Sequence, residues 1–408
     1  MSCSQKDRFV LQELARQYME AASLPVQQER RMLWSCLNRG EPQRPMFVID
    51  QVPVHELNDE GELTAFVEDP VFRGIEMALR LQLYQWRHFP ADMVLEPFVS
   101  VPMAVENSGY GIAVAEQVAV TDPQSSVVSH HYENQIKTEE DLCRIKNMQI
   151  RHDTKETVRR LEEAADIFAG IVPVRAAGIQ FHLGLWDHIS SIMGIETIYM
   201  DLMDRPAFIH KIMRRFTDAT IAGIEEANSL GVHNDTASTC HCSYLYSDSY
   251  PRGNGGGKSQ NAWAFGMAQL FSSVSPQTTE EFELPYISEL ASLFGNLYYG
   301  CCERLDDRLE IVGRIPNVRK VSCSPWNDVD RFAQSLPKHL VMSYKPNPAV
   351  LGAETFDEQA AREELRRAGS AAQQNGLALE IILKDLSTVQ HQPQRLTRWN
   401  EIASELFC

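Results

Sequence analysis

The chain has 408 residues, of which 44% are apolar and 23% charged, and its formal net charge is −17. This composition predicts a large buried core and argues against extensive disorder. The acidic excess argues against a nucleic-acid-binding protein, which normally presents a basic face. Nine cysteines form no disulfide framework, and the sequence has neither an apolar leader nor a run of 18 apolar residues. We therefore expect a soluble cytoplasmic protein that does not contact a membrane.

The first part of the chain divides into a helical extension and the start of a larger domain. Residues 1–45 are predicted to be helical and polar, and Gly40 and Pro42 are predicted to end the last helix of this extension. The main domain is predicted over 46–408, and it opens with the short strand "MFVID". Further helices are predicted at 70–88, 157–171 and 205–229, with a buried strand inside "ADMVLEPFVSVP" at 91–102 and no readable pattern over 103–155.

The segment 233–262 differs from its surroundings. It is rich in Ser, Gly, Asn and His and has no periodicity, which predicts a long loop. In a compact domain such a loop usually forms a lid or a binding loop. It contains "CHC" at 240–242, which is equally compatible with a metal site and with an ordinary loop.

The last third of the chain is regular. Thr278 and Glu281 form a capping-box pattern that predicts a helix ending at Gly295. Four strand–helix units follow, with strands at 297–300, 318–323, 339–344 and 378–383 and helices at 303–314, 327–336, 358–375 and 394–406. Repeated units of this kind predict a parallel sheet. No glycine-rich phosphate loop opens any of these helices, which favours a (β/α)8 TIM barrel over a doubly wound sheet.

The carboxyl ends of the strands are where a barrel carries its active site. The side chains predicted there are Cys301, Cys302, Glu303, Cys323, Pro325, Trp326, Lys345, Pro346, Asn347, Glu380, Lys384 and Asp385, with His182, Trp186, Asp187 and His188 in the earlier segment "FHLGLWDH". Two adjacent thiols at such an end can ligate zinc, act as nucleophiles or simply pack. Trp326 is equally compatible with a core aromatic and with a platform for a ring-shaped substrate. For Lys345 and Lys384 the sequence is compatible both with solvated surface charges and with groups that stabilise an oxyanion.

Three segments, in this order, resemble the uroporphyrinogen decarboxylase superfamily: "RMLWSCLNRGEPQRPMFVI", "VSPQTTEEFELPYISELASLFG" and "MSYKPNPAVL". The resemblance covers roughly residues 30 to 405 and implies a (β/α)8 barrel. The haem-pathway decarboxylases of that superfamily carry an Arg-Gln-Ala-Gly-Arg segment after the first strand, which binds substrate carboxylates. Here the equivalent stretch is "IDQVPVHELNDE", which has no arginine, so this activity is not expected.

The other branch of the superfamily contains zinc methyltransferases that act with a corrinoid protein. Their His-Xaa-Cys-Gly sequence aligns with "YYGCCERL", which places Cys302 on the family cysteine, Gly300 on the histidine and Glu303 on the glycine. The resemblance is greatest to the O-demethylating members, whose zinc ligands vary and include carboxylates. It implies zinc held by Cys301, Cys302 and Glu380, with Cys323 and His241 in reserve.

The resemblance also implies roles for the remaining strand-end residues. Lys345, Lys384 and Asp187 are assigned to catalysis, and His182, Trp186 and Trp326, with Phe181, to substrate binding. The expected reaction moves a methyl group from a small methoxylated aromatic substrate to cobalamin on a partner corrinoid protein. Zinc supplies Lewis acidity at the ether oxygen, and a homo-oligomer is compatible with the sequence. Two other hypotheses remain open, namely a metal-independent decarboxylase or lyase acting on a non-porphyrin acid and a binding module without catalysis.

Overall fold

The computed structural model describes residues 3–120, 128–247 and 256–408. Its helices are α1 (Gln5–Ala22), α2 (Pro25–Asn38), α3 (Pro70–His88), α4 (Thr154–Ile167), α5 (Leu185–Met193), α6 (Ile195–Asp204), α7 (Pro206–Leu230), α8 (Pro276–Phe282), α9 (Leu284–Ala291), α10 (Leu309–Val312), α11 (Val329–Ser335), α12 (Ala349–Gly352), α13 (Glu358–Asn375) and α14 (Gln394–Phe407). Its strands are β1 (Met46–Ile49), β2 (Val99–Pro102), β3 (Val105–Asn107), β4 (Glu116–Ala119), β5 (Ser129–Tyr132), β6 (Ile150–His152), β7 (Val174–Ala177), β8 (Thr239–Cys240), β9 (Ser243–Tyr244), β10 (Trp263–Gly266), β11 (Asn296–Tyr299), β12 (Val318–Cys323), β13 (Val341–Tyr344) and β14 (Ala378–Leu383).

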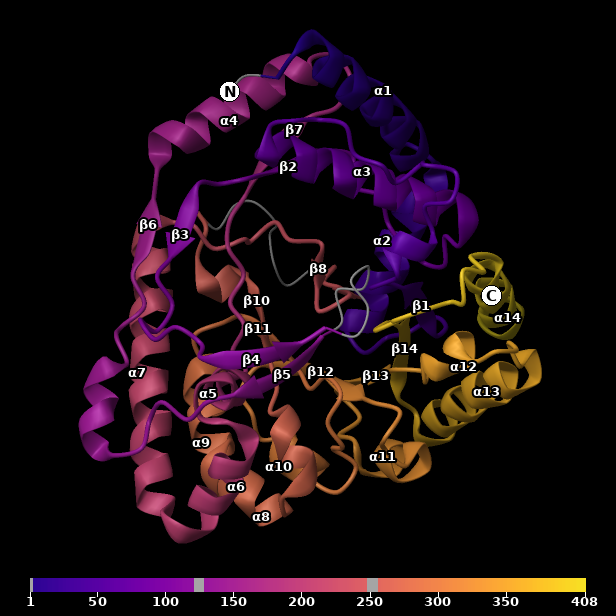
Figure 1. Ribbon diagram of the computed structural model, residues 1–408. Helices are drawn as coiled ribbons and strands as arrows, with labels where there is room; N and C mark the ends of the chain where they lie inside the picture. Colours follow the sequence, from indigo (N-terminus) through magenta and orange to yellow (C-terminus); the bar gives the residue numbers. More distant parts are fainter. Residues whose placement is uncertain (1–2, 121–127, 248–255) are drawn as a thin grey trace.

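A parallel sheet of six strands, in the order β1-β14-β13-β12-β11-β10, forms the frame of the molecule (Figure 1). Every neighbouring pair in it is parallel. The strands β1, β10, β11, β13 and β14 are buried over their whole length. Strands of a parallel sheet that is covered on both faces are continuous apolar runs. Such runs are easy to recognise in a sequence, which is why the strands in the last third of the chain could be predicted.

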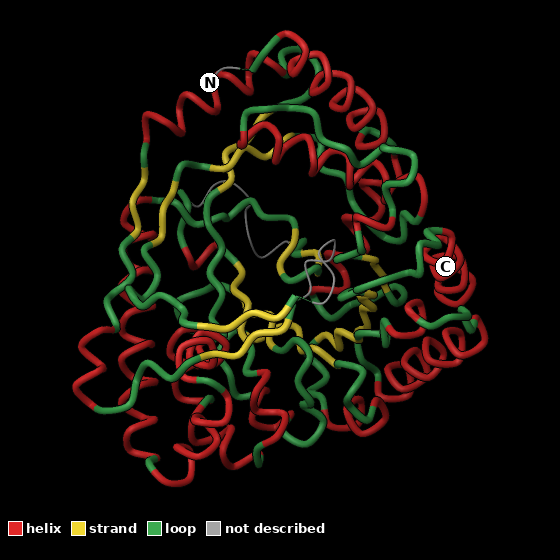
Figure 2. Tube along the Cα trace, viewed as in Figure 1, coloured by secondary structure: helices red, strands yellow, loops and turns green. Residues whose placement is uncertain are grey.

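The closed eight-stranded barrel expected from the sequence is not confirmed. The strands β2 and β7 form a separate two-stranded parallel sheet. Single parallel bridges join Ile179 to His233 and His182 to Phe265 between the two sheets. Figure 2 shows the strands set around the centre of the view with helices outside them. What the structure shows is therefore a mixed α/β fold built on a parallel sheet.

Four of the predicted helices agree closely with the structure, namely α3, α7, α13 and α14. The predicted helix 303–314 is wrong over most of its length, because only Leu309–Val312 is helical. The preceding residues form a turn, and the Asn327 side chain accepts hydrogen bonds from the backbone N–H groups of Leu305 and Asp306. The helix predicted from Thr278 begins earlier, because Ser275 is the residue whose side chain caps α8.

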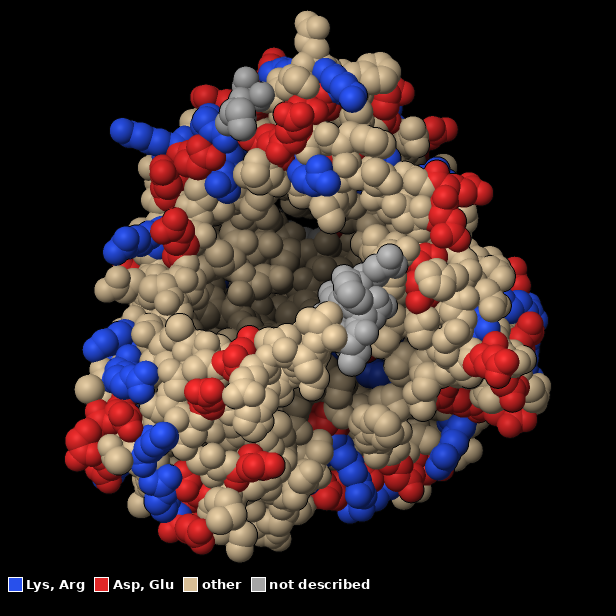
Figure 3. All heavy atoms as spheres, viewed as in Figure 1, with Lys and Arg blue, Asp and Glu red and all other residues tan. Residues whose placement is uncertain are grey.

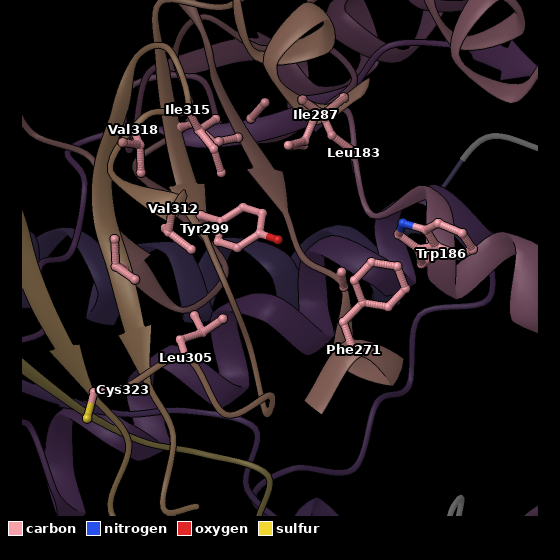
Figure 4. Close-up of a cluster of buried hydrophobic side chains, with 14 of the residues drawn as sticks. Leu183, Trp186, Phe271, Ile287, Tyr299, Leu305, Val312, Ile315, Val318 and Cys323 are labelled. Atoms are coloured by element: carbon pink, nitrogen blue, oxygen red, sulfur yellow. The ribbon is translucent and has the colours of Figure 1, made fainter. Parts of the chain in front are cut away.

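A hydrophobic core fills the space between the six-stranded sheet and the helices α8 to α10. Figure 4 shows Trp186 and Phe271 side by side in this core, with Tyr299 and Leu305 nearby. The ring centroids of Trp186 and Phe271 are 4.7 Å apart. Cys323 belongs to the same cluster. This core holds β11 and β12 in place, and the residues that follow β11 form part of the site described below.

The segment 233–262 was expected to be a long loop, but part of it has regular secondary structure. It contains the short antiparallel pair β8–β9 and, near its end, a turn of 3-10 helix at Ser259–Asn261. Residues 248–255 lie outside the described residues, so its predicted role as a lid stays a prediction. Across the described parts of the chain, no helix combines the length and the apolar character needed to cross a membrane.

Candidate metal and substrate site

A glycine after β11 makes the turn that carries the two adjacent thiols. Gly300 has φ +93°, a conformation that side chains rarely adopt. A Cβ atom there would lie 2.8 Å from Cδ1 of Leu305 and 3.1 Å from Cβ of Ser322. Glycine is therefore required at this position both by the backbone conformation and by the space around it.

The Glu303 carboxylate fixes the turn through hydrogen bonds from two backbone N–H groups. One of its oxygens accepts a hydrogen bond from the backbone N–H of Cys301 at 2.7 Å, and the other accepts from the N–H of Ala268 at 3.1 Å. Glu303 is buried, and burial raises its pKa. Cys301 and Cys302 thereby lie with their sulfur atoms 3.5 Å apart. Although successive strand residues usually point to opposite faces, these two lie in a turn and their thiols converge.

Asp385 completes a group of three potential metal ligands. It follows β14 directly, and its carboxylate Oδ2 lies 3.7 Å from the Cys302 sulfur. The ligand atoms of Cys301, Cys302 and Asp385 all lie within 4.8 Å of one another. Tetrahedral zinc, with bonds of about 2.3 Å to sulfur and 2.1 Å to oxygen, needs separations of about 3.8 Å between two sulfurs and about 3.6 Å between sulfur and oxygen. The sulfur–sulfur distance of 3.5 Å and the sulfur–oxygen distance of 3.7 Å are close to these separations, so the three side chains fit a zinc ion with a fourth position left open.

Lys384 supplies a positive charge beside this group. Its ammonium lies 2.8 Å from the Asp385 carboxylate and 3.5 Å from the Cys301 sulfur. Burial alone lowers the pKa of Lys384, but Cys301 and Asp385 raise it by more, so the side chain stays protonated. Two thiolates and one carboxylate carry three negative charges, which a divalent cation and the Lys384 ammonium together would neutralise.

A second lysine, Lys345, is buried next to the same site. Its ammonium donates hydrogen bonds to the hydroxyl oxygens of Tyr298 and Ser343. The pKa of Lys345 is lowered to about 8, chiefly by burial; Glu380 opposes the lowering and the nearby Lys384 charge adds to it. An ammonium has three N–H donors, so two protein partners leave Lys345 one donor for a ligand.

The "CHC" sequence forms the turn between β8 and β9. His241 and Cys242 both have positive φ angles, 48° and 66°. The His241 ring stacks on Phe265 with centroids 3.8 Å apart. Burial lowers the pKa of His241, and the charges of Lys345 and Lys384 lower it further, so the imidazole is neutral. His241 thus lies among the lysines of the site but outside the group of potential ligands.

Glu380, expected as the third zinc ligand, is engaged elsewhere. Its carboxylate lies 2.7 Å from the Lys320 ammonium and accepts a hydrogen bond from Ser243 at 2.8 Å. Both charged side chains have zero exposure. Asp385, five residues later, takes the position next to the thiols. The reserve ligand Cys323 lies in the hydrophobic core, where burial raises its pKa.

The structure separates the two tryptophans expected to bind substrate. Trp186 has zero exposure and is packed inside the core, whereas Trp326 is 69% exposed. Asp187, expected to be catalytic, accepts a hydrogen bond from Gln269 at 3.2 Å, and burial raises its pKa. His182 lies closer to the site, with its ring 5.0 Å from that of Phe265. Sequence reasoning missed Tyr298, which lies inside β11 and whose hydroxyl accepts a hydrogen bond from Lys345.

Comparison with solved structures shows a shared fold. The chain is similar to a methyltransferase from Methanosarcina mazei, with a TM-score of 0.52 and 11% sequence identity over 92% of this chain and 98% of that chain. No protein-family model matches the sequence, and no curated protein matches it. At this identity the likeness shows the fold alone. The functional conclusion therefore has to rest on the side chains.

Proposed function

We propose that the protein is a zinc-dependent methyltransferase that moves a methyl group from a small methoxylated aromatic donor to the corrinoid of a partner protein. The observation that carries the proposal is the convergence of Cys301, Cys302 and Asp385 at the carboxyl ends of β11 and β14. Thiolates and carboxylates are among the side chains that bind zinc, and catalytic zinc sites use three protein ligands with the fourth position open. The fold shared with a methyltransferase is compatible with this reaction.

The open coordination position would serve the ether oxygen of the donor. Zinc bound there acts as a Lewis acid and stabilises the negative charge that develops on this oxygen as its bond to the methyl carbon breaks. Lys384 holds Asp385 and Cys301 through the contacts described above, so it orients two of the three ligands. We therefore treat Lys384 as a positioning residue.

Lys345 is suited to give a proton to the leaving oxygen. Its pKa of about 8 lies close to neutral pH, where a general acid works best. Tyr298 and Ser343 fix the ammonium and leave one N–H free to donate. Loss of the proton to a phenoxide is easier for a buried lysine than for one in water, because burial disfavours its charge.

The same lysine supports a second candidate function. A buried amine with a lowered pKa can act as a nucleophile towards a carbonyl carbon, so a decarboxylase or lyase acting on a keto acid would use Lys345. Borohydride reduction in the presence of pyruvate would then attach the substrate covalently to Lys345. If zinc-mediated methyl transfer is the function, mass spectrometry will find no such adduct.

Zinc analysis of wild type and variants tests the main proposal. Cys302→Ala and Asp385→Asn are expected to lose near-stoichiometric zinc and to slow methyl transfer from 2-methoxyphenol to a reduced corrinoid protein by at least about 100-fold. Their far-ultraviolet circular dichroism should stay unchanged, because the core supplies the stability. Cys143→Ala, which removes an exposed thiol, is the matched control. Full zinc content and full transfer rate in Cys302→Ala would show that the two thiols only pack.

A further inference from the structure

A cavity of about 830 Å³ lies between residues 105–114 and residues 179–192. It falls in the size range of ligand-binding clefts. None of the described residues that line it is Asp, Glu, Lys or Arg, although 23% of the chain is charged. Figure 3 shows that the hollow in this face of the molecule is also walled mainly by uncharged residues, with acidic and basic side chains around it.

Two imidazoles are among the polar side chains of the cavity, whose lining also includes Asn107, Ser108, Gln180 and Ser191. His182 and His188 both line it, and their rings meet edge to face with centroids 5.9 Å apart. Burial lowers the pKa of His182 to about 4, with a further contribution from His188, and burial also lowers the pKa of His188. Both rings are therefore neutral at physiological pH, and a neutral imidazole has one donor and one acceptor. Nδ1 of His182 already accepts a hydrogen bond from the backbone N–H of Gly184 at 3.3 Å, so its Nε2–H is the donor left for a ligand.

Ring contacts lead from the cavity towards the metal site. Tyr110 meets His188 edge to face at 5.4 Å, and His182 meets Phe265 at 5.0 Å. Phe265 belongs to the same hydrophobic cluster as Cys301. A flat ligand in the cavity would thus lie one aromatic layer from the thiols, with the far end of its ring system among the two imidazoles.

We propose that this cavity binds the uncharged aromatic portion of the substrate, which His182 and His188 recognise through neutral hydrogen bonds. The inference rests on the proposed function, because it takes the ligand to be the methyl donor, whose methoxy group would extend from the cavity past the His182 and Phe265 rings towards the thiols. A carboxylate held between the two imidazoles would lose part of its hydration and would meet no cation among the described lining residues, which disfavours it relative to a neutral group. The volume favours a donor with more than one ring.

A matched pair of two-ring ethers tests the charge requirement. 6-Methoxy-2-naphthol is neutral at pH 7, whereas 6-methoxy-2-naphthoate carries a carboxylate in the same place. Calorimetric titration of the zinc-loaded protein, without the corrinoid partner, should show the naphthol binding at least tenfold more tightly. Equal or tighter binding of the naphthoate would overturn the assignment.

Two substitutions test the residues. His188→Phe keeps a ring but removes its nitrogens, and it should weaken naphthol binding at least fivefold with unchanged zinc content, whereas the exposed control His339→Phe should have no effect. Val114→Arg places a cation at the partly exposed edge of the cavity and should shift the preference towards the naphthoate. If neither His188→Phe nor Val114→Arg changes binding, the cavity does not hold the ligand. Tight naphthol binding without methyl transfer would refute the proposed reaction and leave the cavity assignment standing.

Discussion

Replacing Glu380 by Gln separates a structural charge from a metal ligand. In the wild type the Glu380 carboxylate and the Lys320 ammonium lie 2.7 Å apart with zero exposure, and Lys320 also donates to the Ser243 hydroxyl. At that distance their attraction is about 6 kcal/mol with an effective dielectric constant of about 20. The substitution leaves Lys320 buried beside a neutral amide, so folding must either bury an unpaired charge or remove its proton.

The cost of removing the Lys320 proton sets an upper limit on the loss of stability. An ordinary lysine has a pKa of about 10.4, and deprotonation at pH 7 costs about 1.4 kcal/mol for each of the roughly 3.4 pH units between them. We therefore expect Glu380→Gln to lower the free energy of unfolding by 3 to 5 kcal/mol at pH 7, roughly the value for a broken buried pair. Because deprotonation becomes easier as the pH rises, the loss should shrink to about 2 kcal/mol at pH 9.

Urea denaturation at the two pH values, combined with zinc analysis, checks this reasoning. Glu380→Gln should be less stable but should retain zinc, whereas Asp385→Asn should retain stability and lose zinc. The control Lys320→Met combined with Glu380→Leu removes both charges and should recover much of the stability. A Glu380→Gln protein that loses its zinc and keeps its stability would make Glu380 the third ligand and refute the placement of Asp385 in that role.

Two further outcomes follow from the turn and from the sequence after β1. Gly300→Ala should lower the free energy of unfolding by about 1 to 3 kcal/mol and weaken zinc binding, because its methyl group meets Leu305 and Ser322; wild-type values in both a urea titration and a zinc competition assay would contradict this. The protein should not convert uroporphyrinogen to coproporphyrinogen, because residues 45–72 contain no arginine to pair with the substrate carboxylates. Product formation at a substantial rate by the pure protein would show that another surface binds them.

The regular part of the fold could be predicted because its signal is local. The strands β12 and β14 and the helix α13 have the bounds expected from apolar runs and capping residues. The turn after Cys302 could not be predicted, since it depends on Asn327, about 20 residues away in the sequence. The antiparallel pairs β3–β6 and β4–β5 were unreadable because their residues are largely exposed and carry no apolar alternation.

The site was predictable in position but not in composition. Parallel strands bring their carboxyl ends together, so Cys301, Cys302, Lys345 and Lys384 were expected at the same edge. Which of Glu380 and Asp385 is available beside the thiols depends on an ion pair with a residue distant in sequence. Lys320, on the neighbouring part of the sheet, pairs with Glu380 and so leaves Asp385 available. No local pattern encodes such a contact.

The pairing of β1 with β14 has a consequence for how the protein acquires activity during synthesis. β14 lies between β1 and β13, so the six-stranded sheet stays divided until the end of the chain has been made. Asp385 lies 83 residues after Cys302, so the proposed ligand set is complete only once β14 and the residues after it have been made. Contacts of this range make folding slow. A nascent chain that ends before residue 385 would carry the two thiols without Asp385. We expect it to depend on a chaperone until the rest of the chain has been made.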